Sequence, residues 1–247
     1  MKFIAISLVT AALALGQSVP RASDGKPDLS GTWQGFGVSI NGEPGAPPLH
    51  PLPPTKYKPP ARTPIPYQDW AATKSKTFTV LDDPTSKCLL PGVPRIASMP
   101  MPLEIVQTPK EVVILYEAFR AFRRIPLDAK LQHPDDLTPT WLGDSVGRWD
   151  GDTLVVDVTG FNDKTWLSGL GSIHTEKLHV VEKYRRNEDD TISYEATVED
   201  PGALTKPWVT GSVLRKPVDV RVEEYECIEN NPDNEHIKKA FELHGKK

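Results

Sequence analysis

Proline constrains the fold of this chain more than any other residue type. The sequence holds 25 prolines in 247 residues, and 15 of them fall between positions 44 and 102. Each proline fixes its own φ and lacks an amide donor, so a helical bundle is disfavoured and this segment cannot pair along the middle of a sheet. We expect a β-rich protein in which residues 44–102 form a wrap, with a short helix over residues 67–77.

The two ends of the chain carry their own signals. Residues 1–16 read as a secretory signal peptide, because Lys2 precedes an apolar run that is too short to span a bilayer and small residues follow it. A buried N-terminal helix is the alternative. No later stretch reaches the roughly 18 apolar residues that a membrane helix needs. We therefore expect residues 17–247 to form a single β domain, periplasmic or secreted, without a membrane span.

The cysteine content agrees with export. Only Cys88 and Cys227 are present, and the two cysteines of an exported protein are most simply joined in a disulfide. A reactive thiol is the alternative, but neither cysteine has a CxxC partner or a neighbouring histidine. We predict a structural disulfide between Cys88 and Cys227.

Charge and motif content exclude several function classes. Lys and Arg number 29 against 33 Asp and Glu, a formal net charge of -4, so the chain lacks the basic excess of a nucleic-acid binder. No glycine-rich phosphate loop and no G-x-S-x-G motif occurs in the sequence. We therefore expect no nucleotide cofactor and no nucleic-acid partner. The leading hypothesis is a monomer that binds a small-molecule ligand.

From residue 103 onward, short apolar segments alternate with polar turns. The strongest turn signal is Asp150-Gly151-Asp152, because Asp-Gly readily adopts the positive φ of a tight hairpin. The short connections favour an antiparallel sheet, closed into a barrel or folded as a sandwich, with a C-terminal helix over residues 233–244. The expected strands are residues 32–37, 103–107, 111–116, 119–127, 146–149, 153–159, 178–184, 191–198, 208–214 and 220–227.

Two resemblances bear on this expectation. Gly31-Thr32-Trp33 on a first strand resembles the Gly-x-Trp motif of lipocalins. That resemblance implies a calycin-like antiparallel β-barrel that holds an apolar ligand. Longer segments resemble a family of exported bacterial proteins without a settled activity, which implies export and leaves the reaction open. Those segments are PDLSGTW, DPTSKCLLPGVPR, SVGRWDGDTLVVD and TGFNDKTW, beginning at residues 27, 83, 145 and 159.

His174 and Glu176 are the first candidates for catalysis. Residues two apart share one face of a strand, so if the strand of residues 178–184 extends back, both lie on the face of Glu182. A carboxylate beside a histidine orients the ring and raises its basicity, which suits a proton carrier near neutral pH. The alternative is that both are solvated residues that enter a strand.

Two loops supply candidate binding residues. Residues 131–141 carry His133 and Trp141, and residues 161–166 end at Trp166. Loops at the rim of a barrel hold binding groups because the scaffold fixes their ends. Trp141 and Trp166 are expected to line the entrance to a cavity for a flat apolar or sugar-like ligand; the alternative is that they pack in the core or at its rim.

Arginines on the strands have two interpretations. Arg123 shares a face with Ala121 and Ile125, so it is expected to point inward. A buried arginine–carboxylate pair explains such a position. Arg123 or Arg148 can instead hold the anionic group of a substrate by bidentate hydrogen bonds.

We expect an exported β-barrel protein that binds a small, partly apolar or aromatic molecule and acts on it as a cofactor-free lyase or isomerase. One alternative is a non-enzymatic envelope protein that binds a protein or glycan partner. Another is a metal-dependent hydrolase, which would need His133 and His174 within about 4 Å of one point. No metal is expected, because no HExxH or CxxC spacing occurs in the sequence.

Overall fold

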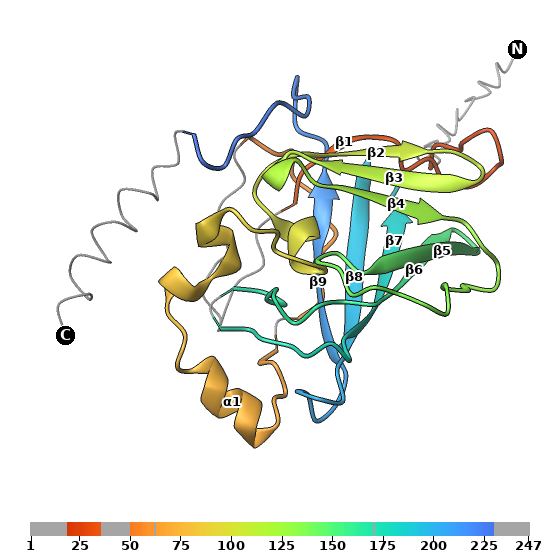
Figure 1. Ribbon diagram of the computed structural model, residues 1–247. Helices are drawn as coiled ribbons and strands as arrows, with labels where there is room; N and C mark the ends of the chain where they lie inside the picture. The colour runs from red at the N-terminus through yellow and green to blue at the C-terminus, as the bar shows by residue number, and fades with distance from the viewer. Residues whose placement is uncertain (1–18, 36–49, 62, 170, 230–247) are drawn as a thin grey trace, which may run out of the picture.

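The computed structural model describes residues 19–35, 50–61, 63–169 and 171–229. Within them the protein is mainly β, with two antiparallel sheets and one α-helix (Figure 1). The expected signal peptide, residues 1–16, and the expected C-terminal helix, residues 233–244, lie outside the described residues. No helix in the described part of the chain is long and apolar enough to cross a membrane.

The first sheet has four strands in sequential order. They are β1 (Gly31–Trp33), β2 (Leu103–Gln107), β3 (Glu111–Tyr116) and β4 (Phe122–Pro126). Inward and outward side chains alternate, so that Ile105 lies opposite Ile114 and both are buried. Apolar pairs of this kind hold one face of the sheet against the core.

The second sheet has five strands, also in sequential order. They are β5 (Asp144–Asp150), β6 (Thr153–Thr159), β7 (His179–Arg186), β8 (Thr191–Glu199) and β9 (Trp208–Arg215). The predicted hairpin joins β5 to β6, and Gly151 takes a φ of 57° there, which suits glycine. Val180, Glu182 and Tyr184 are all buried along β7, as the alternation predicts.

Isolated bridges join the two sheets at both of their seams. Gln34, just after β1, exchanges two backbone hydrogen bonds with Arg215 at the end of β9. Leu127, just after β4, bridges to Gly147 of β5. A Cβ on Gly147 would lie 2.9 Å from Ile125, so this close approach of strands needs glycine. Figure 1 shows β2–β4 lying across β7–β9. Buried apolar side chains from both sheets form one core.

The proline-rich segment lies along β9. Its backbone carbonyls accept hydrogen bonds from side chains of that strand, because its prolines cannot donate to a sheet. Arg215 donates to the carbonyl of Pro53 at 3.1 Å, and the Trp208 indole donates to the carbonyl of Thr63 at 3.0 Å. The helix α1 (Asp69–Ser75) falls within the predicted residues 67–77.

Short 3₁₀ turns complete the described secondary structure. They cover Val80–Asp82, Pro84–Lys87, Arg95–Ser98 and Ala118–Arg120. The last of these shortens the expected strand of residues 119–127, because Phe119 and Arg120 take positive φ and β4 begins only at Phe122. β1 likewise ends at Trp33, and residues 36 and 37 lie outside the described residues.

The prediction of a last strand over residues 220–227 is wrong. This segment has no strand in the structure, although its alternating valines mimic one. Its end is held by side-chain contacts instead, including an ion pair between Arg120 and Glu226 and an edge-to-face contact between Phe119 and Tyr225. Because Arg215 already bridges to Gln34, the far side of β9 is occupied at that point.

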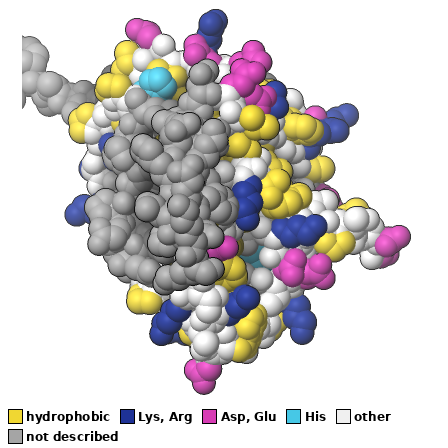
Figure 2. Space-filling model, turned by 60° about the vertical axis from the view of Figure 1, so that its left-hand side comes forward, with side chains coloured by type: hydrophobic (Ala, Val, Ile, Leu, Met, Phe, Trp, Pro, Cys, Tyr) yellow, Lys and Arg dark blue, Asp and Glu magenta, His cyan; other side chains and the backbone are white. Residues whose placement is uncertain are grey.

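The predicted disulfide is confirmed. Cys88 and Cys227 are bonded, with their Cα atoms 5.6 Å apart and a separation of 139 positions in sequence. The bond ties the proline-rich segment to the last described part of the chain. In the chain-entropy account, closing so long a loop stabilises a fold by about 4–5 kcal/mol. Figure 2 shows acidic, basic and hydrophobic side chains interspersed on one face of the molecule.

Candidate functional site

The outer face of the five-stranded sheet carries a row of ionisable side chains at one end. Val146 lies opposite Asp157, and His179 lies opposite Glu199. Because side chains alternate along a strand, this register puts Asp144, Asp157, His179 and Glu199 on the same face of β5, β6, β7 and β8. Four neighbouring strands thus bring three carboxylates and one imidazole together.

The segment between β4 and β5 adds a second imidazole to this face. Thr140 donates its backbone N–H to the carbonyl of Gly160 at 2.9 Å, and Leu137 packs against Gly160. Near the start of the segment, the Asp128 carboxylate accepts the backbone N–H groups of Lys130 and Gln132. These contacts fold the segment back onto the sheet, so that His133 reaches the acidic side chains.

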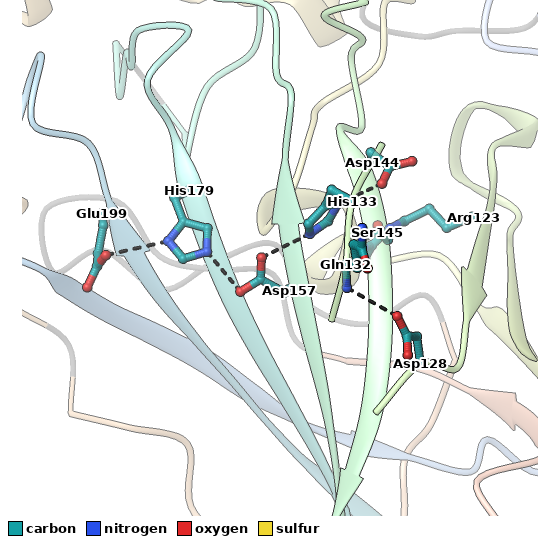
Figure 3. Close-up of polar contacts among 9 residues, drawn as sticks. All are labelled: Arg123, Asp128, Gln132, His133, Asp144, Ser145, Asp157, His179 and Glu199. Atoms are coloured by element: carbon teal, nitrogen blue, oxygen red, sulfur yellow. Dashed lines mark hydrogen bonds and ion pairs between the residues drawn. The ribbon is translucent and has the colours of Figure 1, made fainter. Parts of the chain in front are cut away.

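The five side chains form one continuous line, which we call the carboxylate–imidazole row (Figure 3). His133 Nδ1 lies 2.6 Å from Asp144 Oδ2, and its Nε2 lies 3.0 Å from Asp157 Oδ1. His179 Nε2 lies 2.9 Å from the other oxygen of Asp157, and its Nδ1 lies 3.5 Å from Glu199. Asp157 is therefore shared by two imidazoles, each of which has a second carboxylate.

This geometry controls where protons reside. An imidazolium donates from both ring nitrogens and so satisfies both of its carboxylates, whereas a neutral imidazole donates from only one. When His133 is neutral, one of its hydrogen bonds persists only if Asp144 or Asp157 carries the proton. Each of the two imidazoles can thus hold a proton that it donates to Asp157.

The row is partly open to solvent. The side chain of His133 is 14% exposed and that of Asp157 is 22% exposed, while His179 reaches 37%. Burial alone would lower the pKa of His179, but the hydrogen bonds and charges of Asp157 and Glu199 outweigh it and raise the pKa above its usual value. The protonated form of His179, the more exposed imidazole of the row, is therefore favoured by its two carboxylates.

Directly behind the row, β5 contacts a buried ion pair. Arg123 of β4 donates to both oxygens of Glu182 of β7, at 2.6 and 3.2 Å, and to Ser145 of β5 at 2.8 Å. Tyr184 and Tyr194 each donate to Glu182 Oε1, at 3.0 and 2.8 Å. Of the two interpretations of Arg123, the structure agrees with the buried arginine–carboxylate pair, because Glu182 and Ser145 occupy its terminal nitrogens.

His174 and Glu176 do not lie where the alternation along a strand places them. A turn at residues 176–177 separates them from β7, which begins at His179, so the expected extension of the strand is wrong. His174 is 4% exposed. Its Nδ1 donates to the carbonyl of Thr175 at 2.9 Å, and its Nε2 accepts from the hydroxyl of Thr165 at 2.7 Å. Glu176 is exposed and does not orient the ring.

The pKa of His174 is shifted in the opposite direction to that of His179. Desolvation lowers its pKa, although the hydrogen bond to Thr175 and the charge of Asp200 act in the other direction. The neutral ring is therefore the form that fits its two partners. Asp200 accepts the backbone N–H and the hydroxyl of Thr175 at 2.6 and 2.7 Å, which fixes the residue that holds the imidazole.

The remaining predicted site residues are not brought together. Trp166 is 4% exposed and packs edge-to-face on Phe78, with ring centroids 5.5 Å apart. Trp141 is half-buried beside β5, and Arg148 is exposed on that strand. Trp166 thus packs in the core rather than at the entrance to a cavity. Arg148 faces solvent at the opposite end of β5 from Asp144.

The hydrolase alternative finds no support in the described part of the chain. No group of three or more His, Cys, Asp or Glu side chains there is arranged to hold a metal ion. The imidazole of His133 contacts Asp144 and Asp157, and that of His174 contacts Thr165 and Thr175, so the two rings share no partner.

Most of the carboxylate–imidazole row is not predicted from the sequence. His133 is a predicted binding residue, but its partners are not predicted; the row's other members are Asp144, Asp157, His179 and Glu199. The signal that identifies them is their shared outward position on adjacent strands, which requires the register of β6 with β7. Comparison with known proteins finds no matching family model, curated protein or solved structure. Membership of the exported bacterial family therefore stays a prediction.

Replacement of His174 tests its structural role. We expect His174→Ala to lower the free energy of unfolding by about 2–4 kcal/mol, because it leaves a cavity and removes the partner of a buried hydroxyl and a carbonyl. Urea denaturation measures this change, with Glu176→Ala as the exposed control. A loss below about 0.5 kcal/mol, the usual range for surface substitutions, would contradict it.

The raised pKa of His179 predicts a pH-dependent stability. Its protonated form is favoured in the folded protein, so its contribution is complete below about pH 6.5, the unperturbed value. The contribution is lost as the pH rises through the raised pKa. The difference in unfolding free energy between the wild type and His179→Ala should therefore shrink with rising pH. Denaturant unfolding over about pH 5.5 to 8.5 measures this difference in unfolding free energy. For the control Lys183→Ala, the difference from the wild type should stay constant over that range. A difference that grows with rising pH for His179→Ala would contradict the account.

Proposed function

We propose that the protein is exported and acts on a small, partly apolar or aromatic molecule by proton transfer without a cofactor, as a lyase or an isomerase does. The sharing of Asp157 by two imidazoles, each with a second carboxylate, carries this proposal. Carboxylates that flank an imidazole orient it and stabilise its charged form, which is what a general base or acid requires.

Each member of the row has a distinct role in this proposal. His179 is the proton carrier, because it is the more exposed of the two imidazoles. Asp157 orients it through Nε2 and stabilises the charge that it gains. His133 is more shielded and lies on the far side of Asp157, so it is a positioning residue that keeps this carboxylate in place and offers a second site for the proton.

We also propose that the two sheets act as one calycin-like barrel. The bridges of Gln34 with Arg215 and of Leu127 with Gly147 support it, because they lie at the two seams. The space between the sheets holds apolar side chains and the pair of Arg123 with Glu182. For that reason the proposal puts the chemistry on the outer face of the sheet rather than in an interior cavity.

Export to the periplasm or the cell exterior is supported by the single disulfide. Cys88 and Cys227 are the only cysteines of the chain, and they are paired. Disulfides persist in oxidising compartments and are rare where thiols are kept reduced. The predicted resemblance to exported bacterial proteins and the predicted signal peptide of residues 1–16 are consistent with this proposal.

A second candidate function, binding of a protein partner without catalysis, is favoured by a different observation. Val106, Leu115 and Phe122 are 41%, 37% and 63% exposed on the outer face of the four-stranded sheet. Leu115 lies opposite Phe122, so the side chain of Leu115 and the ring of Phe122 are adjacent. Exposed apolar areas of this kind often mark interaction sites.

A generic elimination tests the catalytic proposal. The probe is 5-nitrobenzisoxazole: a base removes its ring C–H proton, the N–O bond breaks, and a cyanophenolate forms. We expect the wild type to exceed free imidazole at equal concentration by about 100-fold. Asp157→Asn should lose most of this rate, and the rate should rise with pH through the pKa of His179, since the base must be unprotonated.

The matched control is Glu195→Gln. It removes a carboxylate from the outer face of β8 that pairs with Lys183 and does not contact the carboxylate–imidazole row. It should keep the wild-type rate. A wild-type rate no greater than that of imidazole, or equal rates for Asp157→Asn and Glu195→Gln, would overturn the catalytic proposal and leave partner binding as the better function.

A further inference from the structure

A cleft of about 460 Å³ opens at the end of β5 opposite Asp144. Its walls come from the N-terminal turn at Asp24 and Lys26, the turn between β2 and β3, the segment Leu127 to Ala129, and the β5 residues Arg148 and Trp149. Four separate stretches of chain therefore converge on it. Concave sites lined by apolar groups and a few polar ones are the usual places for small ligands.

The cations of this cleft are available, whereas its carboxylates are engaged. Within the described residues, neither Lys26 Nζ nor the Arg148 guanidinium has a hydrogen-bond or ion-pair partner. Asp24 accepts the backbone N–H of Lys26 at 3.0 Å. Asp128 accepts those of Lys130 and Gln132, and these hydrogen bonds lower its pKa. The cleft thus offers the unoccupied N–H donors of two cations to an anion.

An aromatic side chain also lines the cleft. Trp149 is half-buried and packs against the hydrophobic core, which holds its ring in place. Its indole Nε1 has no hydrogen-bond partner among the described residues, although the atom is buried. Leu127, Pro109 and Ala129 supply further apolar contact. A planar hydrocarbon body therefore fits the wall, and an anionic group fits the rim.

We propose that this cleft binds a small aromatic carboxylate. The guanidinium of Arg148 holds the carboxylate through two parallel N–H donors, Lys26 adds a second positive charge, and the ring of the ligand lies against Trp149 and Leu127. The proposal goes beyond the catalytic one, because the cleft and the carboxylate–imidazole row lie toward opposite ends of β5. It holds whether or not the row transfers protons.

Titration with benzoate tests the proposal. The indole N–H resonance of Trp149, assigned with Trp149→Phe, should shift on titration and yield a dissociation constant of about 1 mM or lower. Benzamide has the same shape without the charge, and we expect it to bind at least about tenfold more weakly. Arg148→Gln should weaken benzoate binding by at least about tenfold while leaving benzamide binding unchanged.

Arg185→Gln is the matched control, because Arg185 is an exposed arginine of β7, in the same sheet, that does not line the cleft. It should change benzoate affinity by less than about twofold. Asp157→Asn should also keep wild-type benzoate binding, which separates this proposal from the catalytic one. No shift of the Trp149 resonance at about 20 mM benzoate, or equal losses for Arg148→Gln and Arg185→Gln, would overturn the proposal.

Discussion

The ion pair of Arg123 with Glu182 is the interaction on which the arrangement of the two sheets depends. It joins β4 of one sheet to β7 of the other, and Ser145, Tyr184 and Tyr194 add further hydrogen bonds to it. Burial alone would lower the pKa of Arg123, but the charge of Glu182 outweighs it and raises the pKa well above its usual value. A charge buried in this way is costly unless it is paired and hydrogen-bonded, so the strands that supply the partners must keep their positions.

The buried pair also decides which ionisable side chains are accessible. Because side chains alternate, β5 presents Ser145 to the interior and Asp144 to the outer face. The interior positions are taken by the ion pair and by apolar side chains, so the reactive groups that remain accessible lie outside, where Asp144 meets His133. One rigid strand thus supports the buried cluster, the carboxylate–imidazole row and, at its other end, the cleft at Arg148.

Local patterns predicted much of the fold. Spacing and composition predict the hairpin at Gly151, the helix within residues 67–77, the disulfide and the inward position of Arg123. What the sequence did not predict is the pairing of elements that are distant in the chain. Nothing local indicates that Arg123 meets Glu182, because the contact crosses between sheets, and the partners of His133 depend on how a whole segment folds back. The error at His174 has a local cause: the two-residue alternation was continued through a turn that ends it.

The most direct test of this account is the stability of variants of the buried pair. Arg123→Met should lower the free energy of unfolding by about 3–5 kcal/mol, since it leaves Glu182 buried and uncompensated, whereas Arg123→Met combined with Glu182→Leu should recover most of that loss. Denaturant unfolding of the two variants and the wild type measures both effects. A loss below about 1 kcal/mol for Arg123→Met alone would show that the sheets do not depend on this interaction and would contradict the account.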